Sequence, residues 1–204
     1  MIESVEFAIQ LVVSGICAAI AGYRAIVTQQ KTWLLLTLFY GCFFLGDLYW
    51  QLYLFFYHHT GQFSYISEPC WYAGYLFLFL LLQEMKRQRW PRYKVLWLIP
   101  VFTVSMCVFY MQRGDYFSNL VTVLLMTLLL WHAVKGLLFL RGSGDGRRWL
   151  YVATLVFCLA EYTAWTASCF WLGDTLANPY FWCDFLLTVC LIIFLPALRK
   201  AVEG

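Results

Sequence analysis

Apolar residues fall into seven long runs that are separated by short polar segments. The runs cover 4–23, 32–57, 69–85, 94–112, 116–140, 149–173 and 178–197. About 20 apolar residues are enough for a helix to cross the hydrocarbon core of a bilayer. The pattern therefore predicts an all-α integral membrane protein, with seven transmembrane helices in a single domain over 1–204.

The composition agrees with a membrane protein. The chain has 204 residues, of which 63% are hydrophobic and only 12% are charged, whereas a soluble domain carries about 25% charged residues. The longest polar stretches are 58–68, 86–94 and 141–148, and all are loop-sized. Any binding or catalysis is therefore expected inside the helix bundle or at its mouth, and the first partner is the lipid bilayer.

Basic residues gather in alternate connections between the predicted helices, and Arg113 is the exception. By the positive-inside rule these connections are cytoplasmic, so the N-terminus is outside and the C-terminus is inside. This basic rim is a topology signal, and no nucleic-acid partner is expected. Its members are Arg24, Lys31, Lys86, Arg87, Arg89, Arg92, Lys94, Arg141, Arg147, Arg148, Arg199 and Lys200.

Two parts of the chain have a similar order of residues. The second and sixth predicted helices each carry a carboxylate, Asp47 or Glu161, and a tryptophan about one turn later, Trp50 or Trp165. Each is followed by an outer loop with a proline and then by an aromatic helix start. This similarity suggests a parallel internal repeat, with halves at 1–86 and 114–204 joined by the span 94–112.

The two repeated carboxylates lie near the predicted midplane. At the helical rise, Asp47 is about 22 Å and Glu161 about 20 Å from the cytoplasmic starts of their helices. Ionisable residues at such depth are costly and usually face an interior cavity. No base is expected at the same level, since His132 lies in the inner half of its helix. Two interpretations remain: a neutral Asp47 bonded to a backbone carbonyl or Tyr162, or an acidic site shared with Glu161.

Aromatic residues are abundant, with 10 Trp, 14 Tyr and 18 Phe. Many belong to interfacial belts or to ordinary packing, but several fall on the repeated helices in the outer half. Aromatic faces and carboxylates together suit a small cationic or amphiphilic ligand. The predicted ligand-binding residues are Asp47, Trp50, Glu68, Trp71, Tyr75, Glu161, Trp165, Trp182 and Asp184.

The stretch from Asp47 to Tyr75 resembles a known pattern. A D-x-x-[WY] motif, a short loop with glycine, Ser67-Glu68 and an aromatic run into Gly74-Tyr75 are similar to the seven-helix sensor modules of bacterial diguanylate cyclases and histidine kinases. The resemblance implies ligand sensing in the bacterial inner membrane. Those modules continue into an output domain, so a separate cytoplasmic protein partner is expected here, at 86–94 and the C-terminal tail.

A second resemblance is to lysoplasmalogenase-type membrane hydrolases, through the Gly46-Asp47 pair and the late acidic residue Glu161. It implies an enzyme in which Asp47 and Glu161 act as general acid and base on a vinyl-ether lipid. A small transporter is a third hypothesis, based on the repeat. The sequence has no zinc motif and indicates no cofactor, and Cys70, Cys169 and Cys183 near the outer face allow an external disulfide.

Overall fold

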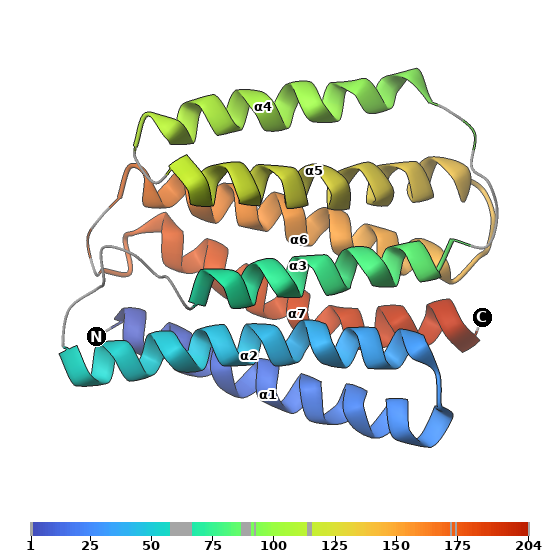
Figure 1. Ribbon diagram of the computed structural model, residues 1–204, viewed down its shortest axis with the longest axis horizontal. Helices are drawn as coiled ribbons and strands as arrows, with labels where there is room; N and C mark the ends of the chain where they lie inside the picture. The colour runs from blue at the N-terminus through green and yellow to red at the C-terminus, as the bar shows by residue number, and fades with distance from the viewer. Residues whose placement is uncertain are drawn as a thin grey trace.

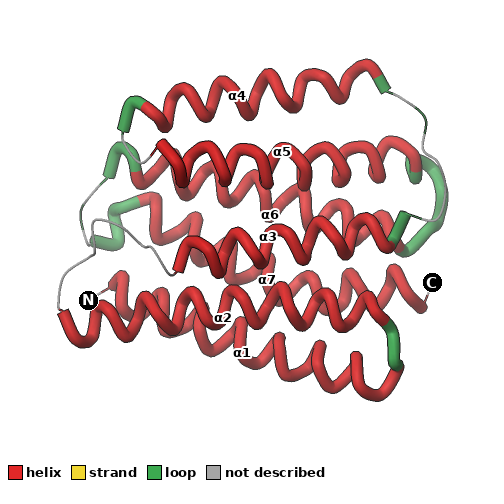
Figure 2. Tube along the Cα trace, viewed as in Figure 1, coloured by secondary structure: helices red, strands yellow, loops and turns green. Residues whose placement is uncertain are grey.

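The protein is an all-helical bundle throughout the residues that the computed structural model describes, which are 2–57, 67–86, 91, 93–113, 116–171, 173 and 175–203. Figure 2 shows helices and loops, and no strand, in this part of the chain. The elements are α1 (Ile2–Thr28), α2 (Lys31–Tyr57), α3 (Ser67–Glu84), η1 (Lys94–Trp97), α4 (Leu98–Met111), α5 (Tyr116–Phe139), α6 (Arg147–Ser168) and α7 (Pro179–Glu203).

Six helical segments in the described residues are long and apolar enough to cross a membrane, which indicates a multi-pass membrane protein. The seven-span prediction is therefore met for all but α3. That helix has 18 residues, but Ser67 and Glu68 stand at one end and Gln83 and Glu84 at the other. The polar ends shorten its apolar stretch, although α3 lies within the bundle alongside the longer helices (Figure 1).

Several helices differ in length from the apolar runs that predict them. Helix α1 continues to Thr28 and ends where Gln29 adopts a positive φ of 55°. Helix α7 continues to Glu203, where an ion pair of 2.8 Å from Arg199 joins adjacent turns. Helix α6 ends earlier than expected, at Ser168, before an aromatic turn. Charged and polar turns thus extend helices beyond the apolar core, and apolarity alone does not mark their ends.

The first and last helices of the chain, α1 and α7, are neighbours in the bundle. Helices α1 and α2 form a hairpin, α6 and α7 form another, and α1 also packs against α7. Helix α3 lies between α2 and α5, and α4 lies at the edge beside α5 (Figure 1). The two termini are at opposite ends of the bundle.

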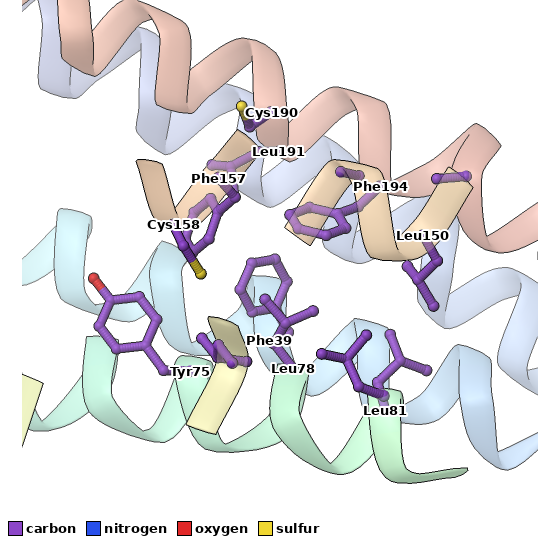
Figure 3. Close-up of a cluster of buried hydrophobic side chains, with 14 of the residues drawn as sticks. Phe39, Tyr75, Leu78, Leu81, Leu150, Phe157, Cys158, Cys190, Leu191 and Phe194 are labelled. Carbon is purple, nitrogen blue, oxygen red and sulfur yellow. The ribbon is translucent and has the colours of Figure 1, made fainter. Parts of the chain in front are cut away.

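Aromatic rings fill the centre of the core. Phe39 of α2 lies 6.0 Å from Phe157 of α6 and 5.4 Å from Phe194 of α7, measured between ring centroids. Figure 3 shows these rings among leucines of α3, α6 and α7, and shows the Tyr75 hydroxyl pointing away from the apolar side chains. A Cβ at Gly74 would lie 2.9 Å from the Phe43 ring, so this glycine allows α3 to approach α2 closely.

Some predicted features belong to the connections. Arg87, Arg89 and Arg92, which form most of the predicted docking surface at 86–94, lie outside the described residues. The same is true of the loop 58–66. The eight cysteines are free thiols, so Cys70, Cys169 and Cys183 are not joined by a disulfide.

Candidate functional site

A cavity of about 260 Å³ lies in the half of the bundle that holds the N-terminus. Every long helix except α4 contributes to its walls, and no lysine, arginine or histidine among the described residues lines it. The cavity collects eight of the nine predicted ligand-binding residues from four helices. These eight are Asp47, Trp50, Glu68, Trp71, Tyr75, Glu161, Trp165 and Asp184.

Trp182, the ninth predicted residue, lies outside the cavity. Its side chain is 60% exposed, and its indole N–H donates to the Leu176 carbonyl at 2.9 Å. The 3.6-residue helical repeat explains the difference. It places Tyr180, Asp184 and Leu187 on the cavity face of α7, and turns Trp182 toward the opposite side. Tyr180 therefore supplies the aromatic wall that was expected from Trp182.

Asp47 is almost fully buried on α2, with an exposed fraction of 1%. Its Oδ1 accepts a hydrogen bond of 3.2 Å from the Trp71 indole N–H. Gly46 makes this contact possible, because a Cβ at that position would lie 2.6 Å from Trp71 Nε1. The partner is therefore neither a backbone carbonyl nor Tyr162, whose own buried hydroxyl has no hydrogen-bond partner. Gly46 thus leaves the space that the Trp71 indole needs to donate its hydrogen bond to Asp47.

Glu161 of α6 is held in a similar way. Its Oε1 accepts a hydrogen bond of 2.8 Å from the Tyr75 hydroxyl, and Trp165, one turn further along α6, lines the same cavity. Hydrogen bonds to charged or ionisable groups are among the stronger ones in proteins. The Tyr75 hydroxyl of α3 therefore fixes the direction of this carboxyl group.

Helix α3 links the two carboxyl groups. Trp71 and Tyr75 are four residues apart, so they lie on one face of α3 in successive turns. The first donates to Asp47 of α2 and the second to Glu161 of α6. The two carboxyl groups also interact electrostatically with each other. The geometry therefore brings Asp47 and Glu161 to a single cavity, with α3 as the shared support.

Helix α1 contributes polar groups that the sequence patterns above did not identify. Glu6, Gln10 and Ser14 follow one another at four-residue spacing, and all three are buried. Gln10 lines the cavity, and the Glu6 carboxyl group interacts with that of Asp184 on α7. The spacing places the three residues on one helix face. The signal available in the sequence was a polar residue at every fourth position within an apolar run.

A second polar wall is formed by α3 and α5. The Tyr72 hydroxyl donates to Glu68 Oε2 at 3.3 Å and is also in short contact with the Ser118 hydroxyl. Glu68 and Tyr72 both line the cavity, and so does Thr122, one turn beyond Ser118. Glu68 therefore lies at the edge of a hydrogen-bonded network between two helices, distinct from the deeper carboxyl groups.

The cavity carries more acidic groups than its own donors satisfy. Asp47 Oδ2 and Asp184 Oδ2 are buried and have no hydrogen-bond partner, and the same holds for the Trp50 indole N–H. Buried polar atoms are normally hydrogen-bonded, and uncompensated charge is costly in an apolar interior. The described residues that line the cavity include no basic side chain, so these carboxyl groups must be neutralised by protons or by a cation from outside that lining.

No protein family model, curated protein or solved structure matches this chain. Among the described residues, no group of three or more His, Cys, Asp or Glu side chains is arranged to hold a metal ion. The chemistry of the site therefore has to be argued from the carboxyl groups, their aromatic donors and the shape of the cavity.

Proposed function

We propose that this chain is a receptor-like membrane protein that binds a small cationic or amphiphilic ligand in the cavity. One observation carries the proposal: two buried carboxylate oxygens, of Asp47 and Asp184, have no partner and belong to a cavity without a basic residue among those described. A cationic group of a ligand in the cavity would compensate the negative charge of these carboxylates. The surrounding indole and phenol rings would attract the same group through cation–π interactions.

The proposed topology has the N-terminus outside, the C-terminus in the cytoplasm and α3 as a seventh crossing. Support comes from the charges, because the basic residues Lys31, Lys94, Arg141 and Lys200 lie at helix ends opposite the cavity. With this orientation the cavity is in the outer half of the membrane, and the residues that would face the cytoplasm carry the basic rim. We assign the protein to the bacterial inner membrane, in line with its resemblance to bacterial sensor modules.

The internal repeat is part of the proposal. Helices α1–α3 and α5–α7 would form parallel halves around α4, and the cavity takes lining residues from both sets. A ligand between two halves signals only if it binds one arrangement of them better than another. The change would be passed to a cytoplasmic partner near 86–94 or at the end of α7.

A membrane-embedded lipid hydrolase is the second candidate. The observation that favours it is the presence of Asp47 and Glu161 in one cavity, as expected from the resemblance to lysoplasmalogenase-type enzymes. Vinyl-ether hydrolysis needs a proton donated to carbon and a water molecule activated by a base, which two carboxyl groups can provide. This candidate predicts turnover, whereas the receptor predicts saturable binding without turnover.

The deciding experiment compares choline with its uncharged analogue 3,3-dimethylbutan-1-ol. Isothermal titration of the purified protein should show saturable binding of choline and much weaker binding of the alcohol, because only choline carries the charge. Asp47→Asn should remove most of the difference. The same samples are incubated with vinyl-ether lysolipid. Aldehyde release that disappears in both Asp47→Asn and Glu161→Gln, with no choline binding, would establish the hydrolase instead.

A further inference from the structure

A second hollow lies between α6 and α7, in the half of the bundle that holds the C-terminus. It is a groove of about 270 Å³ and shares no lining residue with the acidic cavity. Its floor consists of small buried residues, Ala153, Cys190 and Ala197, while Val156 and Ile193 are exposed along its sides. The small side chains of the floor create the recess between the two rows of larger ones.

The groove has the length of one bilayer leaflet. Along α7 it extends from Cys190 to Lys200, which is about 15 Å at the helical rise. The hydrocarbon core of a bilayer is about 30 Å thick, so each leaflet contributes about half of that. Both helices are among those able to cross a membrane. Lipid tails are therefore the surroundings of the groove, and its shape and length suit one acyl chain.

A cation and a tryptophan stand at the mouth of the groove. Lys200 Nζ lies 4.6 Å from the centroid of the Trp149 ring. A wider hollow of about 610 Å³ continues from this point. It shares Trp149, Pro196 and Lys200 with the groove, and adds Gly144, Gly146, Arg199 and Glu203. A Cβ at Gly146 would collide with the Lys200 carbonyl oxygen, so this glycine allows the start of α6 to meet the end of α7.

The charge at the mouth is available to an external anion. Glu203 lines the wider hollow too, but its carboxylate pairs with Arg199 at 2.8 Å, and no ion pair to Lys200 is formed among the described residues. Tryptophan and lysine are typical of the membrane–water interface, where lipid headgroups lie. An apolar groove that ends in a cation at this level matches a lipid that has a phosphate headgroup and net negative charge.

We propose that the groove between α6 and α7 binds one anionic phospholipid, with an acyl chain along Val156 and Ile193 and the phosphate beside Lys200. The proposal does not depend on the function of the acidic cavity. It requires only that α6 and α7 cross the membrane. Such a lipid would cover the contact between α6 and α7 in the half of the bundle opposite the cavity.

Native mass spectrometry of the full chain tests the headgroup. The protein is titrated with phosphatidylglycerol or with phosphatidylcholine that has the same acyl chains, and we expect one tightly retained adduct only with phosphatidylglycerol. Lys200→Gln should weaken that adduct about fivefold, since one basic residue at the surface contributes roughly that much. Lys94→Gln is the matched control, because it removes the same charge from an exposed residue of η1 outside the groove.

Filling the groove tests the acyl chain. Val156→Trp and Ile193→Trp place a bulky ring in the groove from α6 and α7 respectively, and each should remove the adduct while Lys200 remains. Both positions are exposed, so folding should be retained, which gel filtration checks for each variant. Equal binding of the two lipids, or equal weakening by Lys200→Gln and Lys94→Gln, would overturn the proposal. The proposal would also be overturned if the groove is a contact between two copies of the chain. That result would be a protein dimer that Val156→Trp dissociates both with and without lipid.

Discussion

The Tyr75 hydroxyl donates a hydrogen bond of 2.8 Å to Glu161 Oε1, in a fully buried position between α3 and α6. The two residues are 86 positions apart in the sequence. This bond joins the aromatic core to the acidic cavity, since the Tyr75 ring packs on Phe43 and Phe157 while its hydroxyl reaches the carboxyl group. One side chain therefore sets both the packing of α3 and the direction of a candidate site residue.

Removing this hydroxyl should destabilise the protein. Tyr75→Phe keeps the ring but leaves a buried carboxyl oxygen without its donor, which typically costs about 1–3 kcal/mol. We expect a lower thermal unfolding temperature in detergent, measured by fluorescence-detected gel filtration. Tyr162→Phe is the control, because the Tyr162 hydroxyl is buried without a partner and its removal should be neutral or stabilising. Equal losses in the two variants would contradict the assigned role of Tyr75.

Gly46 should be intolerant of a methyl group because of Trp71. Gly46→Ala places a Cβ 2.6 Å from Trp71 Nε1, so the indole must move and its bond to Asp47 is lost. We expect lower thermal stability and a shift in tryptophan emission. Gly41→Ala on the same helix is the control, since a Cβ there meets nothing within 4 Å and alanine favours a helix. The expectation fails if both variants behave alike.

Much of the fold could be predicted because membrane helices are specified by length and apolarity. Six of the seven predicted spans correspond to helices that meet both criteria, and only α3, with Glu68 and Glu84 near its ends, does not. The position of Asp47 and Glu161 in one cavity could also be predicted, because exposing a carboxyl group to lipid is costly and such a group in an apolar helix usually faces the interior.

The features that could not be predicted depend on which face of each helix points toward the cavity. The sequence placed Trp182 and Asp184 in the same site, but they are two residues apart and a helix directs such neighbours to different faces. Glu6 was missed for a different reason. Its depth depends on the packing of α1 against α7, which no local pattern in the first residues indicates, and only its spacing from Gln10 hinted at a buried stripe.

The proposed orientation predicts opposite labelling of two turns. Ser143 lies in the turn between α5 and α6, and Thr175 is in the exposed turn between α6 and α7. In a cysteine-free background, Thr175→Cys should react with an impermeant maleimide in intact cells, and Ser143→Cys only after the membrane is opened. Labelling of Ser143→Cys in intact cells would show that the orientation is the reverse of the one proposed. Labelling of both positions from one side would mean that α6 does not cross the membrane.

Glu6 should be required for ligand binding although it lies only a few residues from the N-terminus. Glu6 is 1% exposed, and its carboxyl group interacts with that of Asp184, whose Oδ2 is a buried acceptor without a hydrogen-bond partner. Glu6→Gln keeps the size and hydrogen-bonding ability of the side chain but removes one negative charge from this group. Attraction for a cation should then fall, while the fold is retained.

Choline titration measures this effect. Choline's quaternary ammonium has no N–H and is attracted by charge alone, so removing one nearby negative charge should weaken its binding by roughly tenfold. Glu84→Gln is the control, because Glu84 pairs with Lys31 at the opposite end of the bundle, where both side chains are exposed. Choline affinity should be unchanged in that variant. If Glu6→Gln binds choline as the unmodified protein does, the Glu6–Asp184 pair has no part in recognition, and the cation must be held by Asp47 and Glu161 alone.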